Sequence, residues 1–239
     1  MTREAHFDRY AESYDEALAQ GLAISGEDKH YFARGRIAFL ANQLAAAGFQ
    51  ARTVLDYGCG TGTATPYLLE HLGARKVIGV DISHRSIEVA TRAYSSLPAE
   101  FLPLEAFRPC EQADLVYCNG VFHHIPPAER ADAIRCIWRA LRPGGYLALW
   151  ENNPWNPATR YVMRRCPFDD DAITLTPPEA RRLVQQGRFT LISTRFLFIF
   201  PRALAFLRWL ESPLARLPLG TQYEILCRKA CGTSDAPMK

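Results

Sequence analysis

The sequence lacks the cysteine spacing of a metal site or of a disulfide framework. Its seven cysteines include no CxxC pair, and no histidine stands near them at zinc-ligand spacing. An odd number of scattered cysteines without a secretion signal predicts reduced thiols in a cytoplasmic protein. The first ten residues, MTREAHFDRY, are too polar for such a signal. We therefore expect a cytoplasmic protein without a bound metal ion.

Long hydrophobic runs and a strong charge of one sign are also missing. The most apolar stretch, residues 189–210, is interrupted by Arg195, Pro201, Arg202 and Arg208, so no membrane-spanning helix is expected. The net charge of +3 is too small to indicate nucleic-acid binding. Residues 151–239 hold 13 basic and 8 acidic residues. This excess either favours an anionic substrate or is an ordinary solvated surface.

What the chain does contain is an alternation of short apolar strands and helices. Helical periodicity marks residues 3–20 and 28–47, and a different rhythm begins near residue 53. Strands are predicted at 53–56, 76–80, 99–103, 114–118, 146–150, 188–198 and 221–228. One helix is predicted to follow the glycine loop after the first strand and to end at about residue 72. Further helices are predicted at 84–94, 127–141, 177–186 and 201–217. Alternating strands and helices predict a Rossmann-like doubly wound α/β fold with a seven-stranded, mostly parallel sheet.

The same pattern suggests how the chain is divided. Residues 1–50 are expected to form a helical N-terminal lid, and residues 51–239 the α/β domain. Residues 151–176 hold several prolines, two adjacent asparagines and an acidic run, and 201–217 interrupts the last strands. We expect substrate-cap insertions near 151–176 and 198–220, because long insertions in compact domains are usually functional.

A glycine loop follows the first strand, in the segment Val54-Leu-Asp-Tyr-Gly-Cys-Gly-Thr-Gly62. Glycines let the backbone turn tightly and approach a ligand, and a helix N-terminus supplies unpaired amide donors. Asp81 ends the next strand, where an acidic residue typically binds the hydroxyls of a ribose. The dinucleotide pattern requires a small residue at position 63, where this chain has Thr63. We therefore predict that NAD does not bind.

The loop resembles the cofactor-binding signature of class I S-adenosylmethionine (SAM) dependent methyltransferases of the small-molecule type. Gly79-Val-Asp-Ile82, residues 113–125 and the turn at 141–147 are similar to later parts of that family. The resemblance implies SAM as cofactor. It implies contacts from Gly58, Gly60, Asp56, Asp81 and Ile82, from Glu105 or Ala106 at the adenine edge, from the Asn119 carbonyl, and from Tyr14 closing over the ligand. Simple helix packing is the alternative for Tyr10 and Tyr14, and capping of the next helix is the alternative for Asp81.

Catalytic and substrate residues are expected beyond the ends of the fourth and fifth strands. His123, His124 and Glu151 are candidate general bases, needed only if the nucleophile arrives protonated. A structural role is the alternative for the histidines. Tyr10, Asn152, Asn153 and Trp155 are candidate substrate contacts, with Trp155 suited to a cation–π contact. An ordinary Asn/Pro turn with one packing Trp is the alternative.

These observations leave several functions open. The leading hypothesis is methyl transfer from SAM to an O or N atom of a small metabolite. The alternative is a SAM-consuming cyclase on the same fold, which forms azetidine-2-carboxylate and methylthioadenosine by intramolecular displacement. A non-catalytic SAM-binding module, or an enzyme that associates with membranes through residues 201–217, is less favoured. The sequence does not reveal the methyl acceptor or the oligomeric state.

Overall fold

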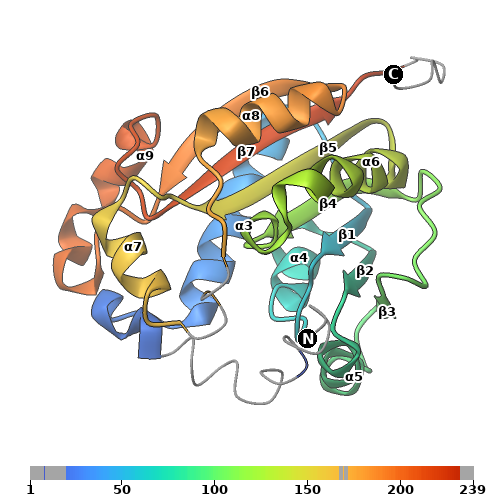
Figure 1. The fold of residues 1–239 in the computed structure, drawn as a ribbon, viewed down its shortest axis with the longest axis horizontal. Helices are drawn as coiled ribbons and strands as arrows, with labels where there is room; N and C mark the ends of the chain where they lie inside the picture. The colour runs from blue at the N-terminus through green and yellow to red at the C-terminus, as the bar shows by residue number, and fades with distance from the viewer. Residues whose placement is uncertain (1–7, 9–19, 167–168, 170–171, 232–239) are drawn as a thin grey trace.

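The fold is a seven-stranded sheet covered by helices, seen in a computed structural model that describes residues 8, 20–166, 169 and 172–231 (Figure 1). The strand order is β3-β2-β1-β4-β5-β7-β6. The strands are β1 (Thr53–Tyr57), β2 (Lys76–Asp81), β3 (Ala99–Pro103), β4 (Ala113–Asn119), β5 (Leu141–Asn152), β6 (Phe189–Leu197) and β7 (Gln222–Lys229). Strands β1 to β5 pair in parallel, whereas β7 pairs antiparallel with both β5 and β6. The predicted mostly parallel, seven-stranded fold is confirmed.

Helices pack on both faces of this sheet. They are α3 (Lys29–Ala46), α4 (Thr65–Leu72), α5 (His84–Ala93), α6 (Arg130–Ala140) and α8 (Pro177–Gln186). Apolar residues of α3 and α4 form one core cluster with the sheet, and those of α6 and α8 form another on the opposite face. The sheet is therefore doubly wound, with helices on both of its faces (Figure 1).

Helix α3 belongs to the predicted N-terminal lid and packs against the sheet. Its Ile37 and Leu40 are fully buried in the same cluster as Val54 and Leu115 of the sheet. This helix is thus part of the core as well as a wall of the site described below. The helix predicted at 3–20, which carries Tyr10 and Tyr14, lies outside the described residues apart from Asp8 and its last position.

The insertion near 151–176 contains a helix that was not predicted, whereas the insertion near 198–220 lacks the α-helix that was. A short helix, α7 (Pro157–Met163), begins where Asn156 accepts hydrogen bonds from the amides of Ala158 and Thr159. Residues 201–217 do not form the predicted amphipathic α-helix. They form a 3₁₀ segment, η5 (Arg202–Leu210), and one turn, α9 (Glu211–Leu214), because Leu204 has non-helical backbone angles.

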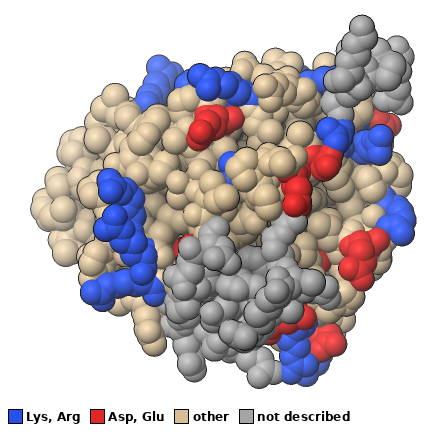
Figure 2. Space-filling view, in the orientation of Figure 1, with Lys and Arg blue, Asp and Glu red and all other residues tan. Residues whose placement is uncertain are grey.

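The surface carries mixed charge. Figure 2 shows acidic and basic side chains dispersed over a mainly uncharged face, with one group of Lys and Arg at its left edge. On η5, Phe206 and Trp209 are largely exposed. Within the described ranges, no helix combines the length and apolar character that crossing a membrane requires.

Candidate functional site

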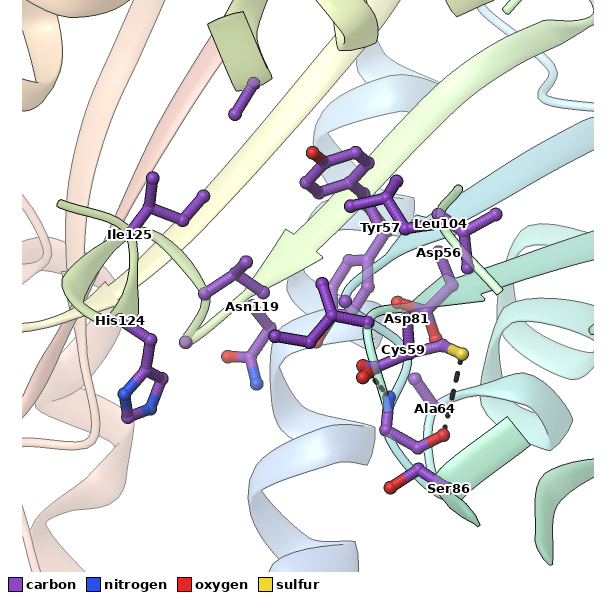
Figure 3. Close-up of a pocket in the computed structure, with 18 of the residues that line it drawn as sticks. Asp56, Tyr57, Cys59, Ala64, Asp81, Ser86, Leu104, Asn119, His124 and Ile125 are labelled. Atoms are coloured by element: carbon purple, nitrogen blue, oxygen red, sulfur yellow. Dashed lines mark hydrogen bonds between the residues drawn. The ribbon is translucent and has the colours of Figure 1, made fainter. Parts of the chain in front are cut away.

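A cavity of about 720 Å³ opens at the carboxyl ends of β1, β2 and β4. This edge of an open α/β sheet is where ligands generally bind. Figure 3 shows Asp56, Cys59 and Asp81 on one side of the cavity and His124 and Ile125 on the other, with Asn119 between them. The volume is that of a site for a small molecule.

The glycine loop after β1 is shaped by hydrogen bonds to β2. The amides of Gly58 and Cys59 donate to the Val80 carbonyl, at 2.8 and 3.0 Å. Gly58 has φ +77°, and a Cβ there would approach a Val121 methyl to 2.2 Å. Gly60 has φ +52°, but a Cβ there would meet no protein atom within 4 Å. The loop therefore packs closely at Gly58 and leaves space for a ligand at Gly60.

Asp56 ends β1 as a buried carboxylate with an unsatisfied atom. Its side chain lines the cavity and is 2% exposed, and its Oδ2 has no hydrogen-bond partner among the described residues. Burial, reinforced by the negative charge of Asp81, raises the pKa of Asp56 to about 7, against the opposing charge of Arg36. A buried polar atom without a partner is costly, so this oxygen is suited to a ligand cation.

Asp81 ends β2 and holds the loop as well as facing the cavity. Its Oδ2 accepts from the Gly60 amide at 2.8 Å, and its Oδ1 accepts from the Ser83 amide at 2.9 Å. Burial raises the pKa of Asp81, while these backbone hydrogen bonds oppose the shift. The N-cap of α5 is Ser83, whose Oγ accepts from the Ser86 amide. The alternative that Asp81 itself caps α5 therefore does not describe this structure.

The other predicted cofactor residues fall into three groups. Ile82 and Asn119 line the cavity with the loop. Glu105 and Ala106 are exposed and do not line it; Glu105 pairs instead with His84 at 3.0 Å, and Leu104 is the neighbouring residue that reaches the cavity. Tyr14 lies outside the described residues, as does Tyr10, which was predicted to contact the substrate.

His123 and Glu151 form a buried pair beside the cavity. Glu151 accepts from the Val121 and Phe122 amides and lies 2.6 Å from His123 Nδ1. Burial alone would lower the pKa of His123, but the carboxylates of Glu151 and Asp169 outweigh it and raise the pKa to about 10. Both side chains are at most 4% exposed, and neither lines the cavity. Glu151 therefore positions the 121–123 backbone and the His123 ring.

His124 is the predicted catalytic candidate that does reach the cavity. Its ring lies 4.0 Å from that of His123, measured between centroids. The Nε2 atoms of both histidines lie 3.5 Å from Asp169 Oδ1. Sequence reasoning did not select Asp169, because it stands 45 positions or more from both histidines.

The predicted substrate residues after β5 have other partners. Asn153 is fully buried, donates to the Pro218 and Gly220 carbonyls, and accepts from the Trp155 amide. Asn152 lies 3.5 Å from Gln222, and Trp155 is half exposed. None of the three lines the cavity. The bonds of Asn153 fit the alternative interpretation of this segment as an Asn/Pro turn.

Arg36 and Lys29 of α3 are cavity residues that sequence reasoning missed. Arg36 is buried, donates through Nε to the Tyr117 hydroxyl at 2.9 Å, and donates through Nη1 to Gln222 at 2.8 Å. The available signal was a cation among Phe32, Ile37 and Leu40 on the apolar side of a predicted helix. The cavity is thus lined by two basic side chains, Lys29 and Arg36, and by the acidic side chains of Asp56, Asp81, Glu129 and Asp132.

These groups fit the predicted cofactor. SAM carries an ammonium and a carboxylate on its methionine part and two hydroxyls on its ribose. The unpartnered Asp56 oxygen, the Arg36 guanidinium and the Asp81 carboxylate offer one group of suitable charge for each. Gly60, where a Cβ would meet no protein atom within 4 Å, lines the same cavity.

Comparisons with known proteins agree with this geometry. Residues 54–145 match the family model described as a methyltransferase domain. A trans-aconitate 2-methyltransferase from Azoarcus sp. (strain BH72) is 32% identical over 117 residues, which cover 49% of this chain and 46% of that protein. A carboxy-S-adenosyl-L-methionine synthase from Erwinia tasmaniensis is 33% identical, covering 44% and 46%. The chain thus spans about half the length of the first curated relatives it matches.

The fold similarity extends further along the chain. In the complex between the Haloferax volcanii Trm112 methyltransferase activator and a putative methyltransferase, a chain matches with a TM-score of 0.65 and 18% identity. The match covers 94% of this protein and 97% of that chain. Residues 54–145, which hold the glycine loop and the acidic residues at the ends of β1 and β2, are thus similar to a methyltransferase domain, and the fold is that of solved structures described as methyltransferases.

Proposed function

We propose that this protein transfers the methyl group of SAM to a carboxylate oxygen of a small organic acid. The observation that carries the SAM half is the unpartnered, buried Asp56 oxygen beside the open space at Gly60. In this proposal Asp56 binds the SAM ammonium, Arg36 lies near its carboxylate, and Asp81 binds the ribose. Leu104 and Ile82 provide apolar contacts for the adenine.

The acceptor half of the proposal rests on the names of the relatives and on one further cation of the cavity. Several relatives are named trans-aconitate 2-methyltransferase, and Lys29 lines the cavity besides Arg36, together with the acidic Glu129 and Asp132. A carboxylate nucleophile arrives deprotonated, so methyl transfer to it requires no general base. This agrees with the burial of His123 and Glu151, which neither line the cavity nor reach a ligand there.

The chain's contribution to the reaction is alignment and exclusion of water. The acceptor oxygen attacks the methyl carbon as the carbon–sulfur bond breaks, and the positively charged sulfonium becomes a neutral thioether. Holding nucleophile, carbon and sulfur in line supplies most of the advantage over solution. Positive charge is lost at sulfur and negative charge at oxygen, so a water-poor cavity favours the step.

The cyclase alternative is not favoured. The matched domain model is a methyltransferase model, and the trans-aconitate relatives carry the same activity in their names. The cavity also extends from the glycine loop to His124, Ile125 and Glu129, beyond the groups that fit SAM. That extension gives space for a separate acceptor.

The test is an acceptor screen with purified protein and methyl-labelled SAM. Small di- and tricarboxylic acids, amines and phenols are supplied in turn, and methyl esters are recognised by their release in alkali. We expect label transfer to one or more carboxylic acids, and none with Asp56→Ala. Transfer only to amines or phenols would contradict the carboxylate acceptor. Rapid formation of methylthioadenosine from SAM alone would support the cyclase instead.

A further inference from the structure

Two histidines and a carboxylate converge beside the cavity, at a place that the SAM-binding groups do not use. His123 Nε2 and His124 Nε2 each lie 3.5 Å from Asp169 Oδ1. One ligand atom from each of the three residues lies within 4.8 Å of the others. The side chains are only 4%, 16% and 6% exposed, respectively.

Both histidines face Asp169 at ion-pair distance, which is longer than the usual charge-assisted hydrogen bond. Charge-assisted N–H···O bonds are about 2.7–2.9 Å long. Asp169 Oδ1 is buried and makes no hydrogen bond to any residue that the structure describes. Around a tetrahedral ion with bonds of about 2.0–2.1 Å, neighbouring ligand atoms lie about 3.4 Å apart. The two 3.5 Å separations are close to this value, and all three ligand atoms lie within 4.8 Å of one another.

Glu151 gives His123 the orientation that a metal ligand requires. It lies 2.6 Å from His123 Nδ1 and is itself held by the Val121 and Phe122 amides. The ring therefore presents its other nitrogen, Nε2, to Asp169. Histidine ligands of metal ions usually donate the remaining ring N–H to a carboxylate in this way.

The backbone that carries Asp169 is joined to the histidine turn. The Ile173 amide donates to the His123 carbonyl at 2.8 Å, and the Ala172 amide donates to the Asp169 carbonyl at 3.0 Å. Arg130 reaches across, donating through Nη2 to the Ile173 carbonyl and through Nε to the Phe122 carbonyl. These bonds fix the approach of residue 169 to the two histidines.

We infer that His123, His124 and Asp169 form a binding site for a divalent transition-metal ion of the zinc type. Two imidazoles and one carboxylate are donors that zinc and its neighbours bind well, and three protein ligands leave a position for an exogenous oxygen. The ion replaces the His123 Nε2 proton and satisfies the Asp169 carboxylate. Of the three residues, His124 lines the cavity, so the site adjoins the cavity at His124.

The role of the ion in the reaction rests on the proposed methyl transfer to a carboxylate. The existence of the binding site does not depend on that proposal. In the acceptor half of the cavity, the ion would bind one oxygen of the acceptor acid and orient the other toward the methyl group. No redox step is involved, and the ion neither gains nor loses electrons.

The experiment is a titration of the chelator-treated full-length protein with Zn²⁺ by calorimetry, and with Co²⁺ by visible absorption. The exposed thiols of Cys110 and Cys231 could bind either ion, so all measurements use a Cys110→Ser, Cys231→Ser background. We expect one ion per chain, and Co²⁺ bands typical of mixed nitrogen and oxygen coordination. Asp169→Asn and His124→Gln should each weaken binding by at least about 100-fold, and Glu151→Gln by about 10- to 100-fold.

His30→Gln is the matched control, because His30, at the start of α3, bonds to Tyr67 of α4 and does not line the cavity. It should bind as the parent does. No saturable binding by the parent, or equal affinity in Asp169→Asn and His124→Gln, overturns the site. SAM binding, measured on the same samples, reports folding. Failure of the metal titration with intact carboxyl methylation would reject the ion and leave the proposed function standing.

Discussion

Asp56 is a residue whose protonation should control ligand binding. Burial and the charge of Asp81 raise its pKa to about 7, and the SAM ammonium binds only the ionised form well. Below this pKa, SAM affinity should fall by about tenfold per pH unit as protons compete. Calorimetry at about pH 5.5, 6.5 and 7.5 tests this.

Asp56→Asn serves as the matched variant for that experiment. It preserves shape and removes the titrating group, so its SAM affinity should be lower near neutral pH and nearly independent of pH. S-adenosylhomocysteine, which retains the ammonium, should show the same pH dependence with the parent protein. An unchanged slope in Asp56→Asn would assign the titration to another group.

Asp81 is proposed to bind the ribose, and it also accepts a hydrogen bond from the Gly60 amide of the loop. A single substitution tests the ribose role. Asp81→Asn keeps the shape but replaces one acceptor with a donor, so the ribose or the Gly60 amide loses its partner. Hydrogen bonds to charged groups contribute about 1.5–3 kcal/mol. SAM affinity should therefore fall roughly ten- to a hundredfold, as calorimetry would measure.

Ser83→Ala is the control for the Asp81 variant. Ser83 caps α5 and does not line the cavity, so its loss should lower the melting temperature, at a cost of about 1 kcal/mol, and leave SAM affinity nearly unchanged. If Asp81→Asn behaved in the same way, the ribose role would be refuted.

At the scale of elements, predictions succeeded where the local pattern was sufficient. The strands β1, β2 and β3 are short runs that end just before a glycine, at an aspartate and at a proline, and their bounds lie within one residue of the predicted ranges. The structure differs from the predictions in the two insertions. Residues 201–217 have helical periodicity, but the backbone of Leu204 is non-helical and the segment forms only a 3₁₀ helix and one short turn. Helix α7 depends on the cap that Asn156 provides within a segment predicted as loop.

The junction between β5 and the segment preceding β7 depends on Asn153. Its buried amide donates to the Pro218 and Gly220 carbonyls, and its Oδ1 accepts from the Trp155 amide. Asn153→Ala should cost about 2 kcal/mol, because it leaves buried carbonyls unpaired. For a chain of this length the melting temperature should fall by about 4–8 °C. SAM affinity should be preserved, and a selective loss of acceptor affinity at unchanged stability would instead support the substrate role.

At the scale of the whole molecule, the site is assembled from segments that only the fold brings together. The glycine loop, Asp56 and Asp81 could be predicted, because each ends an apolar strand at a spacing typical of a cofactor site. Arg36 comes from α3 and bonds to Tyr117 on β4 and Gln222 on β7. Asp169 reaches the histidines from another loop. Neither contact has a periodicity or spacing in the sequence, so local patterns could not identify them.

Glu224 of β7 bonds to Gln43 of α3, and its ionisation should lower the stability of the folded protein as pH rises toward 8. It is fully buried, its Oε2 accepts from Gln43 Nε2, and its Oε1 has no hydrogen-bond partner among the described residues. Burial, opposed by Gln43 and Arg195, raises the pKa of Glu224 from 4.5 to about 8. Between these values the folded protein holds a proton that the unfolded chain has lost, so stability falls as pH rises.

Replacing Glu224 with glutamine should remove this pH dependence. The amide side chain keeps an oxygen that accepts from Gln43 and cannot ionise, so Glu224→Gln should gain stability relative to the parent as pH rises. A shift of one pKa unit corresponds to about 1.4 kcal/mol, so the relative gain between about pH 6 and pH 9 should be about 2–3 kcal/mol. Urea denaturation at both pH values measures it, with the exposed Glu88→Gln as control. Parallel stability profiles for Glu224→Gln and the parent would show that Glu224 ionises without cost in the folded protein, which its burial makes unfavourable.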